Sequence, residues 1–434
     1  YYSKTNSDGS LGIFEKDTDI FVSELIKTDV RKWSNNSISC NISSNDTGKY
    51  FLITVYTNIK AFVNDTFQLK IPENSVASAE ENTGPVSAIT DFSIKTILPQ
   101  SFNLNDTIEI TGAGLGFFYS ASAIGDYDND GDLDISVIGT DNGLARRLYI
   151  YRNNSNNTFT NIFSGQGLNN GLVKWADYNL DGLLDITCQG LDGSNDRMLI
   201  YKNNSGDSFG LTAEPFGTNQ GLERGGIDWS DYDNDGDIDF VASGIGSGSH
   251  LKVYRNNGNN NFVIAQDLLG GDGLDYSSVK WRDFDNDGYP DIIAVGKDAS
   301  NKRLIIYKNS YGTNFSIADQ PMGNNQGVWY SGLDCGDFDS DGFTDFVVSG
   351  EDNAGTKRFI IFINNGNMTF SQISEPFGAG IGLYRGSISC GDYDNDGDID
   401  IAGTGLDNSG NRRLVLIRNN GDLTFTKHEE PFGI

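Results

Sequence analysis

The chain has 434 residues and a formal net charge of −29. This negative charge disfavours nucleic acid and anionic membrane surfaces as partners, because both carry charge of the same sign. No run of 18 apolar residues occurs, so the sequence predicts no membrane-spanning helix. Two His and four widely spaced Cys make a zinc centre improbable. The chain begins without Met, as expected of a mature or trimmed form, so the missing signal peptide says nothing about export.

Residues 1–98 show the alternation of apolar and polar residues that is typical of strands. The clearest examples are residues 50–56, 66–71 and 87–94. The pattern resembles a small immunoglobulin-like β-sandwich, and residues 48–71 are similar to modules of secreted bacterial surface proteins. We expect a domain over this range.

An early turn at residues 6–17 leaves little chain for the first strands of this sandwich. The sandwich is therefore expected to lack a strand, and its open edge could be completed by a strand from a neighbouring copy. Such strand complementation would join copies head to tail into a filament. A trimmed chain is the alternative explanation. Residues 99–105 are expected to link this domain to the next.

From residue 106 to residue 434, one acidic loop recurs six times. Loops 1 to 6 begin at Asp126, Asp177, Asp231, Asp283, Asp337 and Asp392. By subtraction, successive starts lie 51 to 55 residues apart, and such a period indicates one repeated structural unit. No helical periodicity is apparent in the repeats.

The fourth repeat illustrates the unit. It predicts four short strands, at residues 278–282, 292–296, 304–308 and 314–318. Four strands in a unit of this length are typical of a β-propeller blade, so the fold class is all-β. Six blades are expected. Seven are the alternative, because residues 105–115 match the outermost strand of other repeats.

Each loop follows the spacing D-x-D-x-D-G-x-x-D, with Asn at the third position of loop 2. Side chains at positions 1, 3, 5 and 9 and the carbonyl at position 7 are a ligand set for Ca²⁺, and Gly at position 6 permits the sharp turn. The predicted ligands are Asp126, Asp128, Asp130, Asp132, Asp134, Asp177, Asn179, Asp181, Leu183, Asp185, Asp231, Asp233, Asp235, Asp237, Asp239, Asp283, Asp285, Asp287, Tyr289, Asp291, Asp337, Asp339, Asp341, Phe343, Asp345, Asp392, Asp394, Asp396, Asp398 and Asp400.

Polar turns are the simpler explanation for Asp, Asn and Gly clusters. Six loops with matching carboxylates favour a metal instead, because packed like charges repel without a cation. Magnesium fits less well, since it prefers fewer protein ligands. About six Ca²⁺ sites are predicted. Loop 2 is expected to be the weakest, because Asn179 lowers its charge.

Two residues before each loop lies a position that is expected to be buried. Its occupants are Ile124, Trp175, Trp229, Trp281, Cys335 and Cys390. Because this position accepts Cys among larger apolar residues, we expect these thiols to be free, with a disulfide as the minority alternative.

These loops and the Gly-rich residues around them resemble FG-GAP/VCBS repeats, as in the propeller of integrin α-subunits. The resemblance covers about residues 106–434. It implies Ca²⁺ in the loops, an extracellular setting and a role in binding or adhesion. The chain departs from integrin-type propellers, which usually have seven blades, because here only six repeats are complete and all six carry the loop.

The expected function is that of an extracellular or cell-surface, calcium-stabilised adhesion or structural assembly protein. Its expected partners are other copies of itself or an extracellular protein or glycan. A carbohydrate-binding lectin is the alternative, which the resemblance also allows, with Trp329, Tyr330 and Tyr384 as stacking candidates that are more readily explained as core residues. No catalytic constellation is found, so an enzyme is not expected unless its site lies in sequence beyond this chain.

Sequons for N-glycosylation are numerous, although a chain rich in Asn, Ser and Thr produces many by chance. They begin at Asn35, Asn41, Asn45, Asn64, Asn105, Asn153, Asn156, Asn203, Asn314 and Asn367.

Overall fold

The computed structural model describes eight short strands within residues 1–98. From residue 116 to residue 428 it describes every residue except 157, 219, 247–249, 259, 271, 376–381 and 395. The chain divides into two compact units, Tyr1–Leu98 and Pro99–Ile434. All described regular elements are strands, which confirms the all-β class, and the described residues include no helix that could cross a membrane.

The strands described in the first unit form four antiparallel pairs. They are β1 (Tyr2–Ser3) with β4 (Tyr50–Phe51), β2 (Ile26–Asp29) with β3 (Lys32–Ser34), β5 (Thr66–Phe67) with β8 (Lys95–Thr96), and β6 (Lys70–Ile71) with β7 (Ile89–Thr90). The predicted sandwich and its missing strand otherwise lie outside the described residues and stay predictions.

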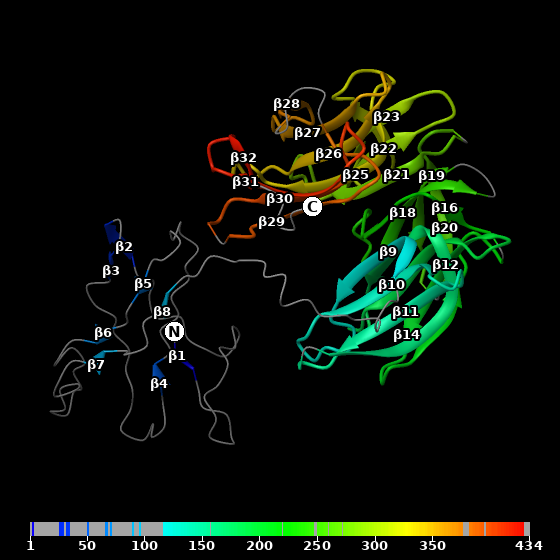
Figure 1. Cartoon of the computed structure of the whole chain (residues 1–434), viewed down its shortest axis with the longest axis horizontal. Helices are drawn as coiled ribbons and strands as arrows, with labels where there is room; N and C mark the ends of the chain where they lie inside the picture. The colour runs from blue at the N-terminus through cyan, green and yellow to red at the C-terminus, as the bar shows by residue number, and fades with distance from the viewer. Residues whose placement is uncertain are drawn as a thin grey trace. The chain divides into compact units, whose positions relative to one another are not determined.

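Within the described part of the second unit, the strands form six repeats of four antiparallel strands (Figure 1). Repeat 1 contains β9 (Phe117–Gly125), β10 (Asp134–Asp141), β11 (Arg146–Asn153) and the first part of β12 (Phe159–Ala176). Repeat 2 contains the rest of β12, β13 (Asp185–Leu191), β14 (Asp196–Asn203) and β15 (Phe209–Ala213). Repeat 3 contains β17 (Ile227–Ser230), β18 (Asp239–Gly246), β19 (His250–Asn256) and β20 (Phe262–Asp267), with the short β16 (Leu222–Glu223) also paired to β18.

The last three repeats have the same order. Repeat 4 contains β21 (Asp275–Arg282), β22 (Asp291–Lys297), β23 (Lys302–Asn309) and β24 (Phe315–Asp319). Repeat 5 contains β25 (Val328–Gly336), β26 (Asp345–Asp352), β27 (Lys357–Asn364) and β28 (Phe370–Ser374). Repeat 6 contains β29 (Ile388–Gly391), β30 (Asp400–Leu406), β31 (Arg412–Asn419) and β32 (Phe425–His428). The four strands predicted for repeat 4 are all confirmed, each to within three residues at either end.

The hydrophobic core lies between consecutive repeats, in five clusters. Strand β26 shows how. Phe346 and Val348 pack toward repeat 4, whereas Val347 packs toward repeat 6, because successive side chains of a strand point to opposite faces. All three side chains are fully buried, and burying each stabilises the fold by about 1.5–3 kcal/mol.

Both faces of an inner strand are therefore covered, which explains its continuous apolar sequence. Four-stranded sheets packed face to face in this way are the blades of a β-propeller. The number of blades, six or seven, stays a prediction.

Candidate metal centres in the acidic loops

Each acidic loop connects the first and second strands of its repeat. In loop 4, Asp283 accepts hydrogen bonds from the backbone N–H groups of Asp287 and Gly288, at 3.1 and 2.8 Å. Gly288 has a φ of +88°, which glycine adopts without strain. The glycines at position 6 of the other five loops have φ values between +86° and +95°, so the same turn recurs in all six.

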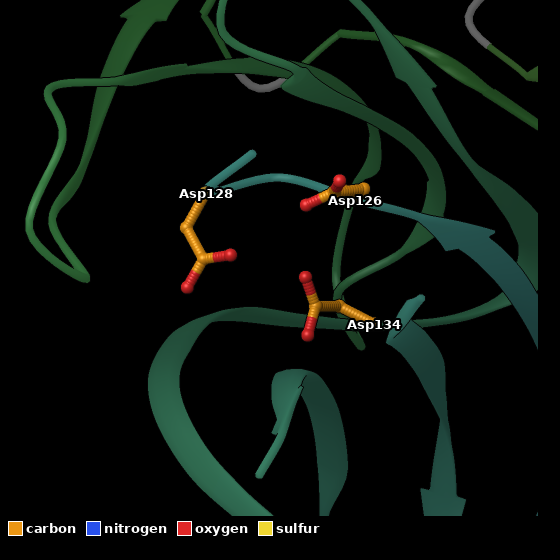
Figure 2. Close-up of side chains that lie close together, drawn as sticks. All are labelled: Asp126, Asp128 and Asp134. Atoms are coloured by element: carbon orange, nitrogen blue, oxygen red, sulfur yellow. The ribbon is translucent and has the colours of Figure 1, made fainter. Parts of the chain in front are cut away.

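This turn gathers the acidic side chains. In five loops, one carboxylate oxygen from each of positions 1, 3 and 9 lies within 4.8 Å of the other two. Figure 2 shows the carboxylates of Asp126, Asp128 and Asp134 directed toward a shared space. The other four triads are Asp231, Asp233 and Asp239; Asp283, Asp285 and Asp291; Asp337, Asp339 and Asp345; and Asp392, Asp394 and Asp400.

Not every predicted ligand joins these triads. At position 5, Asp130 instead accepts a hydrogen bond from the N–H of position 7, Asp132, at 2.9 Å. Loop 2 has an amide in place of the third carboxylate, and Asn179 Nδ2 donates to Asp185 Oδ2 at 2.7 Å. Positions 5 and 7 would therefore complete a metal shell around a core of positions 1, 3 and 9.

The carboxylate at position 9 is buried and fixed by the backbone. Asp345 accepts hydrogen bonds from the N–H groups of Asn364 and Phe338, each at 2.8 Å. Burial nevertheless raises the pKa of Asp345 to about 7, because the charged form loses its hydration and faces Asp339. The pKa values of the equivalent Asp185, Asp239, Asp291 and Asp400 are also raised to about 7 by burial, and that of Asp134 to about 6.

The donor set fits a hard divalent cation. All side-chain donors of the five triads are carboxylate oxygens. Oδ1 of Asp128 and Oδ1 of Asp285 are buried without a hydrogen-bond partner, although such atoms normally have one. A cation would satisfy these atoms and offset the repulsion between the carboxylates. The repeated Asp clusters can thus hold metal ions.

A buried Asn links each of loops 1 to 5 to the following repeat. Asn309 Nδ2 donates to the carbonyl of Tyr232 in loop 3 at 2.8 Å, and also to Pro290 of its own repeat at 3.0 Å. Asn203, Asn256, Asn364 and Asn419 make the same bond to position 2 of loops 1, 2, 4 and 5. The signal in the sequence is an Asn at the end of the third strand of every repeat, but Asn there is also typical of a turn, so its contact with another repeat is not evident from the sequence. The sequon at Asn203 belongs to this buried set and is only 1% exposed.

The aromatic residue at position 2 of a loop can also contact the following repeat, through ring stacking. Tyr127 stacks on Trp175, and Tyr232 on Trp281, with ring centroids 6.0 Å apart in both pairs. Each Trp belongs to the repeat after the loop. Among the six residues expected to be buried before the loops, only Trp281 is buried, at 3% exposure. The expectation is wrong for Ile124, which is 65% exposed, and the other four residues are half-buried. Ile124 lies in repeat 1, and the described residues include no preceding loop that could cover it.

The two thiols at this position are half-buried, where full burial was expected. Cys335 and Cys390 pack at the edges of apolar clusters and are free, as is the buried Cys188. Cys40 lies outside the described residues.

Some loops also contact one another directly. Asn129, Asn234 and Asn286, at position 4 of loops 1, 3 and 4, donate their side-chain amides to the carbonyl of the Gly in the next loop, at 2.9 to 3.0 Å. Loops 2 and 5 have Leu180 and Ser340 at this position. The described loops are thus joined as 1 to 2 and as 3 to 4 to 5.

A β-propeller whose blade loops carry Asp triads defines the class of protein. A family model described as an FG-GAP-like repeat matches residues 126–188, 231–294, 283–348 and 337–403. Each match begins at the first Asp of a loop and extends through the following loop. Together they cover just over half of the 434 residues, so the chain belongs to the FG-GAP-like repeat family.

Two solved structures illustrate what this chain is similar to. One is a mutant of the Aleuria aurantia lectin in complex with alpha-methyl-L-fucoside, with 11% identity, a TM-score of 0.42, and coverage of 73% of this chain and 96% of that chain. The other is AofleA from Arthrobotrys oligospora, with 12% identity, a TM-score of 0.42, and coverage of 74% and 89%. No match is found among curated proteins.

Proposed function

We propose that the acidic loops bind Ca²⁺, in about six sites, and that the ions stabilise the packing of one blade on the next. The observation that carries this proposal is the position of each triad. In loop 4, the triad residues Asp283 and Asp285 flank Phe284 in the sequence, and the carbonyl of Phe284 accepts a hydrogen bond from Asn364 of the next repeat at 2.7 Å. An ion that fixes the two Asp residues also fixes the residue that holds the neighbouring blade.

Calcium is favoured over other hard cations by the size of the donor set. Three carboxylates, with a further side chain at position 5 and a carbonyl at position 7, exceed what Mg²⁺ usually takes from a protein. Repeated sites that must stay filled suit an environment with millimolar Ca²⁺. We therefore assign the protein to the outside of the cell, as a non-enzymatic adhesion or assembly module.

Calorimetric melting of the full chain tests the calcium proposal. Millimolar Ca²⁺ should raise the melting temperature above that of metal-stripped protein. The same concentration of Mg²⁺ should produce a much smaller increase in melting temperature. A melting temperature that is indifferent to Ca²⁺ would refute it. Electron microscopy and sedimentation in Ca²⁺ then test the assembly role, for which filaments or self-association are expected. The strand exchange proposed for such a filament involves residues 1–98, most of which lie outside the described residues.

A cluster of rings and cations favours glycan binding as a second candidate. The guanidinium carbon of the exposed Arg385 lies 4.5 Å from the ring centroid of Tyr330 and 5.4 Å from that of Tyr384. Trp329 is half-buried beside Lys297 and Lys302. Half-exposed rings beside charged groups can stack on sugars and bind their hydroxyls. A glycan array with the full chain and an Arg385→Ala control tests this role, and the absence of any bound glycan would count against it.

A further inference from the structure

A basic residue stands directly before the Asn that closes the third strand in five of the six repeats, and this Asn is the buried Asn in repeats 2 to 6. These residues are Arg152, Lys202, Arg255, Lys308 and Arg418, and Ile363 takes the place in repeat 5. The basic residues lie at the end of the third strand, beside the acidic loop, and four of them form ion pairs with carboxylates of that loop.

In repeat 4 the basic group contacts the carboxylates at positions 3 and 5 of the loop. Lys308 Nζ binds Oδ2 of Asp285 and Oδ2 of Asp287. Oδ1 of the same Asp285 is buried without a partner. Lys308 therefore leaves the inner oxygen free for an ion, while it brings a positive charge next to the site.

Two other repeats have the same arrangement. Arg255 contacts Oδ2 of Asp233 at 3.2 Å and Oδ2 of Asp235 at 2.6 Å. Arg418 contacts Oδ2 of Asp394 at 3.0 Å and Oδ2 of Asp396 at 2.7 Å. In repeat 2, Lys202 reaches position 5 of its loop, whereas Arg152 of repeat 1 pairs with Asp207 of repeat 2.

Loop 5 is different. Ile363 is 8% exposed and packs in an apolar cluster that includes Phe338 and Ile361. Among the described residues, no Lys or Arg forms an ion pair with the four carboxylates of loop 5, which belong to Asp337, Asp339, Asp341 and Asp345. No ion pair with a basic side chain of the described residues therefore offsets the negative charge of this loop.

We propose that the residue before the buried Asn sets the calcium affinity of each loop, and that loop 5 binds Ca²⁺ more tightly than loop 4. The inference rests on the proposed binding of Ca²⁺ by the loops. A fixed positive charge next to the carboxylates repels an incoming divalent cation and weakens the field that attracts it. An aliphatic side chain at the same place does neither.

Loops 4 and 5 form a matched pair within one chain. Both have Asp at positions 1, 3, 5 and 9 and an aromatic residue, Tyr289 or Phe343, at position 7. The ligand side chains are thus identical, and the difference on which the inference depends is Lys308 against Ile363.

Nuclear magnetic resonance of the full chain with ¹⁵N-labelled glycine can follow the two loops separately. The N–H groups of Gly288 and Gly342 donate to the first Asp of loops 4 and 5, so each resonance reports one site. We expect Gly342 to reach half of its chemical-shift change at about tenfold lower free Ca²⁺ than Gly288. The ratio of these two Ca²⁺ concentrations should fall at high salt, because salt screens the charge of Lys308.

Exchange of the two residues gives the decisive comparison. Lys308→Ile should lower the Ca²⁺ concentration at half-shift for Gly288 and leave Gly342 unchanged, whereas Lys308→Arg should preserve the wild-type order. Ile363→Lys should raise the concentration for Gly342, provided that circular dichroism shows a folded variant. The inference would be overturned if Gly288 and Gly342 of the wild type reached half of their shifts at the same Ca²⁺ concentration. It would also be overturned if Lys308→Ile raised the Ca²⁺ concentration at half-shift for Gly288. If neither resonance responded to Ca²⁺, the proposed function itself would fail.

Discussion

Asn364 donates its side-chain amide to the carbonyl of Phe284, 80 residues earlier, at 2.7 Å. The bond joins repeat 5 to the acidic loop of repeat 4. Asn364 also donates to Thr344 at 3.1 Å and accepts a hydrogen bond from Gly366 at 3.0 Å, so one buried side chain closes its own turn and holds its neighbour.

Replacement of Asn364 by Ala should therefore be costly. Because buried partners are left without hydrogen bonds, we expect the free energy of unfolding to fall by about 3 kcal/mol. Urea unfolding of metal-stripped protein measures this. The adjacent Asn365 is exposed and bonds only within its own turn, so Asn365→Ala should change the free energy by less than about 0.5 kcal/mol. If the two substitutions lowered the free energy of unfolding equally, the hydrogen bond between Asn364 and Phe284 would not have the stabilising role proposed for it.

The position before the loops offers a second matched pair. Trp281 is 3% exposed and stacks on Tyr232 of the preceding repeat, whereas the equivalent Ile124 is 65% exposed. Trp281→Ala should cost about 3–5 kcal/mol through the cavity that it leaves. Ile124→Ala should be close to neutral. Thermal and urea unfolding measure both variants, and a large loss in Ile124→Ala would show that another part of the protein covers this residue.

Loop 2 should fill last in a calcium titration. Asn179 supplies an amide where the other loops have a carboxylate, and Lys202 brings a positive charge to within 2.9 Å of Asp181. Asn179→Asp should tighten this site by about tenfold, because ligand charge tunes affinity. The Gly182 amide resonance, recorded as for the other loops, gives the measurement. Loop 2 filling first would refute the prediction.

Without metal, the protein should be less stable at pH 8 than at pH 5. The pKa of Asp345 is raised from 3.8 to about 7, so folding favours its protonated form. That contribution is fully present below pH 3.8 and is lost as the pH rises through 7. The four other position-9 carboxylates with pKa values near 7 act in the same direction.

With saturating Ca²⁺, the protein should instead be more stable at pH 8 than at pH 5, because metal ligands must be deprotonated. Urea midpoints at the two pH values, with and without Ca²⁺, measure both effects. Asp345→Asn keeps the shape of the side chain but removes its charge. It should reduce both the loss of stability between pH 5 and pH 8 in the metal-free protein and the gain of stability on adding Ca²⁺. A metal-free protein that is more stable at pH 8 would contradict the assignment.

Most of the repeat itself could be predicted from the sequence. The Asp spacing fixed the position of each loop, and the apolar runs located the strands of repeat 4 to within three residues. Both signals are local, because strand alternation and turn chemistry act over a few residues.

The contacts between repeats could not be predicted in the same way. Asn364 and Phe284 are 80 residues apart, and nothing in either segment indicates that they meet. The exposure of Ile124 was missed for a similar reason, because burial there depends on a neighbour and not on the residue type. The charge beside each loop was missed because Lys308 reads as an ordinary strand residue until the loop is placed beside it.

Strand β12 determines how the protein can be divided for study. Its first residues pair with β11 of repeat 1 and its later residues pair with β13 of repeat 2, without a break. A protease cut or a truncation within Phe159–Ala176 would therefore damage two sheets at once. Shortened versions that begin after Ala213 would leave the remaining sheets whole, and repeats 1 and 2 would have to be removed or kept together.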